Sequence, residues 1–201
     1  MSWPDSLTLL EWSANAFTAL CVVLAARRHI ATWPLGIIGS ALYMRLFHQT
    51  QLYADVALQI FFIGTSIWGW REWRHQAASP PAQQTSDKAR LTSRQVTILT
   101  ALGVGVTLAY GTLLTHWTQA FAPFWDSAVL TTSVIAQLLL MQGRRETWPC
   151  WIVVNTLSVP LYISRGLHVT AVLYALFWLN AWHGWWVWHR ADRGAFKGQP
   201  T

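Results

Sequence analysis

The chain has 201 residues, of which 53% are apolar and only 11% are charged, and its formal net charge at pH 7 is +6. Because soluble domains carry about 25% charged residues, this composition excludes an ordinary soluble protein. The Lys and Arg residues lie in short clusters between apolar runs. This placement is typical of membrane topology and argues against nucleic-acid binding.

Seven stretches are long and apolar enough for a spanning helix, which needs about 20 mostly apolar residues. In chain order they cover about 6–26, 33–50, 53–74, 94–116, 123–142, 147–165 and 168–189. The first stretch has no basic segment before it and no small-residue cleavage site after it, so we expect a membrane helix and no signal peptide. The segment 75–93 is rich in Ala, Gln, Ser and Pro, which predicts a polar loop. The fold class we expect is an all-α integral membrane protein.

The basic residues also predict the orientation. With the N-terminus outside, 12 of the 14 Lys and Arg residues lie in cytoplasmic loops or the C-terminal tail, and only Arg45 and Arg165 lie on the other side. Because cytoplasmic loops carry an excess of Lys and Arg, we expect an N-out, C-in topology.

Two segments, 33–73 and 148–188, match at a constant shift of 115 residues without a gap. The shared positions are Trp33-Pro34 with Trp148-Pro149, Gly69-Trp70 with Gly184-Trp185, and Trp73 with Trp188. Each matched segment covers the second and third helices of a three-helix unit, so the helix at 94–116 restores the orientation between the two units. We therefore expect one transporter domain over 1–201 with 3+1+3 parallel repeats, namely repeat 1 at about 6–74 and repeat 2 at about 123–189. A substrate site is expected on the axis between such repeats.

Polar side chains at membrane depth are candidates for that site. Gln59 and Asn155 lie well inside their helices, and the 115-residue shift pairs Gln59 with Tyr174. Asn180 lies twelve residues into the last helix. We expect these residues to contact substrate, although amide side chains can also serve only as hydrogen-bonded packing between helices.

The 15 Trp residues include some that lie deep within the predicted membrane helices and others that lie near the helix ends. Trp151 and Trp178 lie deep, so we expect one of them to stack on a substrate ring. Those near helix ends are expected to anchor the spans at the membrane interface. They are Trp33, Trp70, Trp73, Trp148, Trp185, Trp186 and Trp188.

Motifs for catalysis are absent from the sequence. Cys21 and Cys150 stand singly, and the seven His residues form no HExxH pattern. No pair of deep carboxylates predicts a proton relay. We expect no catalytic residue, no metal, no cofactor and no enzyme activity.

Several runs together resemble the PnuC family of vitamin transporters. They are Trp33-Pro34-Leu35-Gly36-Ile37-Ile38-Gly39, Leu52-Tyr53-Ala54-Asp55 with Leu58-Gln59, Gly69-Trp70 with Trp73, Pro123-Phe124-Trp125-Asp126-Ser127, Trp151-Ile152-Val153-Val154-Asn155 and Leu161-Tyr162. The resemblance implies a SWEET-like seven-helix fold in the bacterial inner membrane. It also implies facilitated diffusion (uniport) of nicotinamide riboside, which phosphorylation then traps inside the cell.

Other functions stay open at this stage. Thiamine or another ring-bearing vitamin precursor or nucleoside is an alternative substrate. A non-transporting membrane scaffold, or a substrate-binding subunit of a larger machine, is an alternative of a different class. The partners expected are the small-molecule substrate and the lipid bilayer, with a homo-oligomer left open and no nucleic acid.

Overall fold

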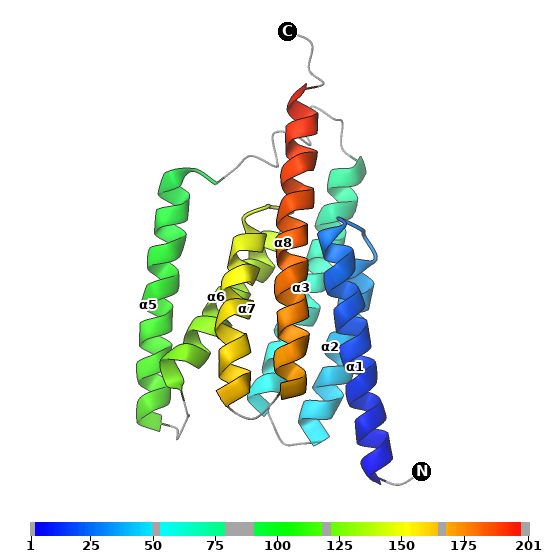
Figure 1. The fold of residues 1–201 in the computed structure, drawn as a ribbon, viewed down its shortest axis with the longest axis vertical. Helices are drawn as coiled ribbons and strands as arrows, with labels where there is room; N and C mark the ends of the chain where they lie inside the picture. Colours follow the sequence, from blue (N-terminus) through cyan, green and yellow to red (C-terminus); the bar gives the residue numbers. More distant parts are fainter. Residues whose placement is uncertain (1–2, 50–52, 79–90, 118–121, 165–167, 198–201) are drawn as a thin grey trace. The chain divides into compact units, whose positions relative to one another are not determined.

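The computed structural model describes residues 3–49, 53–78, 91–117, 122–164 and 168–197, and this part of the chain forms seven α-helices (Figure 1). The helices are α1 (Trp3–Ala26), α2 (Thr32–Gln49), α3 (Tyr53–Ala78), α5 (Ser93–Trp117), α6 (Pro123–Met141), α7 (Thr147–Ser164) and α8 (His168–Lys197). Each predicted stretch is a helix, which confirms the all-α prediction. The last helix continues to Lys197, beyond the end expected at residue 189.

Three of these helices are long and apolar enough to cross a membrane by length and composition alone. They contain the stretches Leu9–Ala26, Ser93–Trp117 and Pro123–Met141. The other helices carry Trp, His and amide side chains among their apolar residues, which lowers their hydropathy.

The described helices belong to two compact units. The first unit is 1–84 with 141–143, and within it α2 packs against both α1 and α3. The second unit is 85–140 with 144–201, and within it α7 and α8 lie side by side (Figure 1).

Turns of the same construction join α1 to α2 and α6 to α7. Arg28 and Gly143, which are 115 residues apart, both have positive φ, at 52° and 69°. In each turn a later backbone N–H reaches back five residues, from His29 to Leu24 O and from Arg144 to Leu139 O. These bonds are typical of a Schellman helix end.

A buried threonine fixes the start of the next helix in both places. The Thr32 hydroxyl donates to Cys21 O at 2.8 Å, and the Thr147 hydroxyl donates to Ala136 O at 2.7 Å. Both partners are again 115 residues apart, so the repeated sequence produces repeated contacts.

A tryptophan ring packs on a glycine in each unit. The Trp33 indole lies against Gly69 and meets Trp73 edge-on at 5.1 Å. The Trp148 indole lies against Gly184, and its centroid is 5.5 Å from that of Trp188 at an interplanar angle of 80°. Because glycine has no side chain, a large ring can approach the helix backbone.

The prediction that these tryptophans are interface anchors is therefore wrong for four of them. The buried residues are Trp33, Trp73, Trp148 and Trp188. Each ring is covered because it packs within a Trp–Gly–Trp contact, and Trp188 is 0% exposed. Trp186 differs, since it is 51% exposed and the Arg190 guanidinium lies 3.7 Å from its ring centroid, as expected of an anchor.

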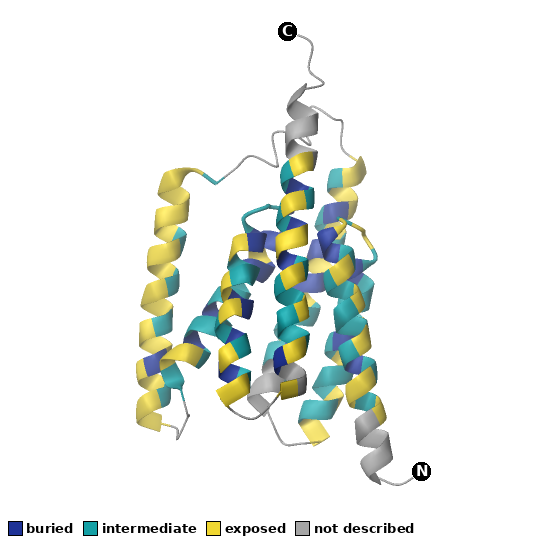
Figure 2. Ribbon diagram, viewed as in Figure 1, coloured by how far each residue is buried: buried dark blue, intermediate teal, exposed yellow. Residues whose placement is uncertain are grey.

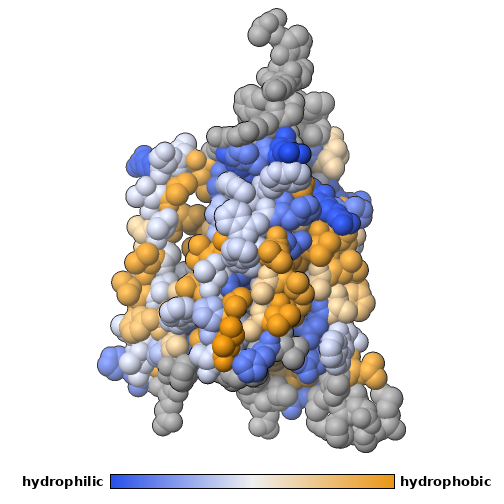
Figure 3. All heavy atoms as spheres, in the orientation of Figure 1, coloured by the Kyte–Doolittle hydropathy of each residue, from blue (hydrophilic) through white to orange (hydrophobic). Residues whose placement is uncertain are grey.

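Helix α5 is the most exposed of the helices described. Figure 2 shows it as exposed or intermediate along almost its whole length, with Gly111 buried where the Phe124 ring meets it. Its exposed side chains include Leu102, Val104 and Leu113, and Figure 3 shows apolar atoms along much of the helix. This exterior is suited to hydrocarbon and not to water.

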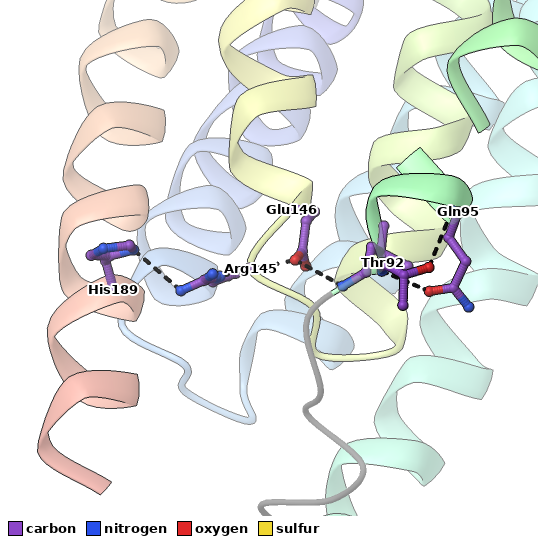
Figure 4. Close-up of polar contacts among 6 residues, drawn as sticks. Thr92, Gln95, Arg145, Glu146 and His189 are labelled. Atoms are coloured by element: carbon purple, nitrogen blue, oxygen red, sulfur yellow. Dashed lines mark hydrogen bonds and ion pairs between the residues drawn. The ribbon is translucent and has the colours of Figure 1, made fainter. Parts of the chain in front are cut away.

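Polar contacts fix the beginning of α5 to the turn between α6 and α7 (Figure 4). Thr92 and Gln95 form a reciprocal capping box, in which each side chain accepts the other's backbone N–H. Glu146 accepts the Leu91 N–H at 3.2 Å, and Arg145 lies between Glu146 and His189.

Candidate substrate site

One face of α7 combines aromatic and hydrogen-bonding side chains. Trp151, Asn155, Ser158 and Tyr162 are separated by four, three and four residues, which places them on one face of a helix. Asn155 is 4% exposed and Ser158 is 0% exposed. The helix contains no Asp, Glu, Lys, Arg or His from residue 147 to residue 164, so this face is neutral.

The two polar side chains on this face have no described partner. Neither the Asn155 amide nor the Ser158 hydroxyl makes a side-chain hydrogen bond to any residue that the structure describes. A buried polar group without a partner costs about 1–3 kcal/mol. Such groups are therefore uncommon in a packed protein core, and a polar ligand could form hydrogen bonds with them.

Aromatic side chains from α8 continue this face at one end. The Tyr162 and Tyr174 rings lie 4.8 Å apart between centroids, and Tyr174 lies 5.7 Å from Phe177. The structure thus brings Tyr174 to the same face of α7 as Asn155 and Ser158.

The deep tryptophans occupy different places. Trp151 is half-buried on the face with Asn155. The Trp178 indole donates to the Thr156 hydroxyl at 3.0 Å, and that hydroxyl donates to Ile152 O at 2.7 Å. Because Thr156 lies about 100° around the helix from Asn155, Trp178 is held beside a different face of α7.

The remaining expected residues lie on other helices. Asn180 is half-buried on α8, two residues after Trp178. Gln59 lies on α3 in the first unit and is buried, without a described side-chain partner. Ser66 follows it by seven residues on the same helix face, and its Oγ would lie 3.5 Å from a Cβ added to Gly36.

Ser158 and Ser66 were not among the residues expected to contact substrate. The sequence showed Ser158 only as one of several polar residues in its helix, and Ser66 only as a departure from the family pattern. The signal was the spacing, because each serine shares a helix face with an expected amide, Asn155 or Gln59.

The hydrogen-bond ladder of α7 is interrupted beside the polar face. Pro160 lies inside the helix and has no N–H, so it cannot bond the Thr156 carbonyl four residues before it. One residue further, the Trp125 indole donates to Leu157 O at 2.7 Å. A side chain from α6 therefore binds the α7 carbonyl next to the one that loses its helix bond at Pro160.

Other features of the described residues do not converge on this face. No group of three or more His, Cys, Asp or Glu within the described ranges could hold a metal ion. Two grooves lie along single helices, one of 420 Å³ beside Gly64 and Trp68 on α3 and one of 480 Å³ beside Leu102 and Gly105 on α5. Neither groove includes a residue of the polar face.

Comparison with known proteins identifies relatives along almost the whole chain. Residues 8–190 match the family model described as Nicotinamide mononucleotide transporter. The nicotinamide riboside transporter PnuC of Escherichia coli (strain K12) is 27% identical, over 93% of this chain and 87% of its own. The PnuC of Neisseria mucosa is 32% identical, over 79% of this chain and 60% of its own.

A riboflavin transporter and a solved structure are also similar to this chain. The riboflavin/roseoflavin transporter RibM of Streptomyces davaonensis is 21% identical, over 94% of this chain and 92% of its own. The crystal structure of the vitamin B3 transporter PnuC superposes with a TM-score of 0.73 at 27% identity, covering 96% of this chain and 85% of that one.

Proposed function

The chain belongs to the nicotinamide mononucleotide transporter family, and we propose from this membership that it carries nicotinamide riboside across the membrane. Membership confirms the family predicted from the sequence motifs, and it is that of a transporter and not of an enzyme. The observation that carries the choice of substrate is the neutral face of α7, with the buried Asn155 amide and the buried, unpartnered Ser158 hydroxyl.

The absence of charged side chains from this face of α7 argues against a phosphate group on the substrate. A phosphate monoester carries up to two negative charges and is bound in proteins by Arg, Lys or helix N-termini. The face of Trp151, Asn155 and Ser158 offers none of these. Moving a phosphate against neutral side chains would leave a buried charge without a partner, which is strongly unfavourable.

We propose that the helices form 3+1+3 parallel repeats within one domain over 1–201, with the N-terminus outside and the C-terminus in the cytoplasm. Repeat 1 covers about 6–74, the linker helix about 94–116 and repeat 2 about 123–189. The turns, threonine contacts and Trp–Gly contacts that recur 115 residues apart support this arrangement. The asymmetric distribution of Lys and Arg supports the orientation and a position in the bacterial inner membrane.

The substrate contacts we propose are those expected from the sequence, namely Gln59, Asn155, Trp151, Tyr174, Trp178 and Asn180. Asn155 and Gln59 would bond the polar edges of the substrate, since both are buried without described partners. Trp151 is the stronger candidate for stacking, because it lies on the same face of α7 as Asn155, whereas Trp178 is bonded to Thr156 beside another face.

Transport by uniport, with trapping by phosphorylation in the cytoplasm, is the mechanism we propose. The sequence places no pair of carboxylates at membrane depth that could couple transport to a proton or sodium gradient. Substrate should then move down its own gradient in either direction.

A second candidate is a larger ring-bearing vitamin or precursor, such as riboflavin or thiamine. The observation that favours it is the similarity to RibM, together with the aromatic contacts of Tyr162, Tyr174 and Phe177. Aromatic side chains stack on many rings with little selectivity, so these contacts alone do not choose the substrate.

Uptake into proteoliposomes that contain only this protein tests the proposal. Labelled nicotinamide riboside should equilibrate across the membrane without an imposed gradient, and unlabelled riboside should compete. Nicotinamide mononucleotide should compete poorly. Absence of any uptake would favour a scaffold or a subunit of a larger machine, and uptake of thiamine or riboflavin alone would select the second candidate.

A further inference from the structure

We propose that the groove beside Gly64 and Trp68 on α3 binds one anionic phospholipid, whose phosphate contacts the Arg71 guanidinium. The inference requires a chain that lies in a membrane, and it does not depend on which substrate the chain carries. The proposed orientation decides only which leaflet supplies the lipid, namely the cytoplasmic one.

The groove lies along one exposed face of α3. Its lining includes Gly64, Trp68, Arg71 and His75, which are spaced four, three and four residues apart and therefore share one side of the helix. All four residues are exposed, and Trp68 is 64% exposed. Gly64 forms the hollow, because a Cβ added there would have nothing within 4 Å. The groove volume of 420 Å³ lies within the range of about 300–1,000 Å³ that is typical of small-molecule sites.

The order of side chains along this face matches the parts of a phospholipid. Ile60 and Ile67 flank the hollow at Gly64 and are 59% and 44% exposed, which offers an apolar surface to an acyl chain. At about 1.5 Å per residue, Arg71 lies about 10.5 Å beyond Gly64 toward the end of α3. The exposed Trp68 lies between them, at the depth where an indole ring is typical of the membrane interface. A lipid whose chain lies beside the isoleucines would therefore hold its phosphate near Arg71.

The Arg71 side chain is available to a phosphate. It makes no hydrogen bond or ion pair with any residue that the structure describes. Glu72 also lines the groove, but its carboxylate accepts from Gln76 Nε2 at 2.9 Å, and consecutive residues of a helix do not face each other. A guanidinium presents a planar fork of donors that matches two phosphate oxygens. Basic residues at the cytoplasmic side favour lipids with a net negative charge, which selects an anionic headgroup over a zwitterionic one.

The second repeat has the same exposed face in a filled form. The 115-residue shift places Leu179 at the position of Gly64, and Leu179 is 58% exposed. Trp186 stands at the position of Arg71, and its ring centroid lies 3.7 Å from the Arg190 guanidinium. Arg71 has no such ring contact with the described residues. The first repeat thus has a hollow where the second has a side chain, and a cation without the ring that the second repeat supplies.

Lipid binding to the purified full-length protein tests the site. Native mass spectrometry in detergent measures the affinity for phosphatidylglycerol and for phosphatidylcholine with the same acyl chains. One Arg near an anionic headgroup contributes a factor of about five in binding. Arg71→Gln should therefore weaken phosphatidylglycerol binding about fivefold and phosphatidylcholine binding less. Gly64→Leu introduces the side chain that the second repeat carries at this position, so it should fill the hollow and weaken the binding of both lipids.

Arg27 provides the matched control for charge. It is exposed in the turn between α1 and α2 and does not line the groove, so Arg27→Gln should leave the affinity for phosphatidylglycerol unchanged. Equal losses in Arg71→Gln and Arg27→Gln would overturn the site, because they would show a diffuse attraction to the net charge. Thermal unfolding without lipid should be the same for Arg71→Gln and the wild type, since the Arg71 side chain is exposed.

Two further results would overturn the proposal. A wild type that binds both lipids equally tightly would show no selection of the anionic headgroup, and this result does not depend on any variant folding. Unchanged lipid binding in Gly64→Leu, together with a change in the oligomeric mass measured by light scattering, would instead assign this face of α3 to a contact with a second copy of the chain.

Discussion

Trp148 lies so close to Gly184 that a Cβ added to this glycine would stand 2.6 Å from its ring. Gly69 and Trp33 stand in the same relationship 115 residues earlier. In each case the ring cannot retreat easily, because its other side meets a second tryptophan edge-on. These Trp–Gly contacts hold together α2 and α3 in one unit and α7 and α8 in the other.

Adding one methyl group at Gly184 should therefore destabilise the protein. Overpacking a filled contact costs about 1–3 kcal/mol, and we expect Gly184→Ala and Gly69→Ala both to lower the Tm in detergent. Gly105 on α5 has nothing within 4 Å of an added Cβ, so Gly105→Ala is the matched control. It should leave the Tm unchanged or raise it, since alanine favours a helix over glycine by about 1 kcal/mol. Equal effects at Gly184 and Gly105 would show that the ring contact does not matter.

Trp188 and Trp186 are two residues apart, yet they should respond differently to truncation. Trp188 is fully covered against Trp148, so Trp188→Ala should cost about 3–5 kcal/mol of stability, as for other buried Trp residues. Trp186 is half exposed, and Trp186→Ala should have a much smaller effect on unfolding. Thermal unfolding of both variants compares them directly. If Trp188→Ala unfolds at the same temperature as the wild type, Trp188 is an interface anchor, as its position in the sequence predicts, and its burial does not stabilise the fold.

The difference between Trp188 and Trp186 shows which properties the sequence could predict. Helix positions followed from apolar runs and their polar breaks, and the family followed from motifs spread along the chain. The burial of Trp188 could not be predicted, because it depends on a ring contributed by Trp148, forty residues away. The sequence also could not predict that the Ser158 hydroxyl is unpartnered, because only the structure shows that it makes no bond to a backbone carbonyl. The sequence shows that a side chain is polar or aromatic, but it does not show which group forms a hydrogen bond with it or packs against it.

The proposed topology can be tested with single cysteines in segments outside the described residues. Ala82 lies in the predicted cytoplasmic loop and Gln199 in the predicted cytoplasmic tail, while Gln51 lies in a predicted outer loop. In a background without Cys21 and Cys150, an impermeant thiol reagent added to intact cells should label Gln51→Cys only. Ala82→Cys and Gln199→Cys should react after the membrane is opened. Labelling of either from outside would reverse the orientation.

Substrate affinity should depend on Asn155 and Trp151 more than on Trp178. Asn155→Ala removes a buried amide without a described partner, and we expect affinity for nicotinamide riboside to fall about tenfold, near the upper limit for one neutral hydrogen bond. Trp151→Ala should cost a similar or larger factor, since base–aromatic stacking contributes about 1–3 kcal/mol. Trp178→Phe keeps an aromatic ring but loses the indole bond to Thr156. It should therefore lower the Tm while changing the affinity for substrate little. Isothermal calorimetry for affinity and thermal unfolding for stability separate these effects. If Asn155→Ala lowers the Tm but binds substrate as tightly as the wild type, Asn155 serves as hydrogen-bonded packing between helices and not as a substrate contact.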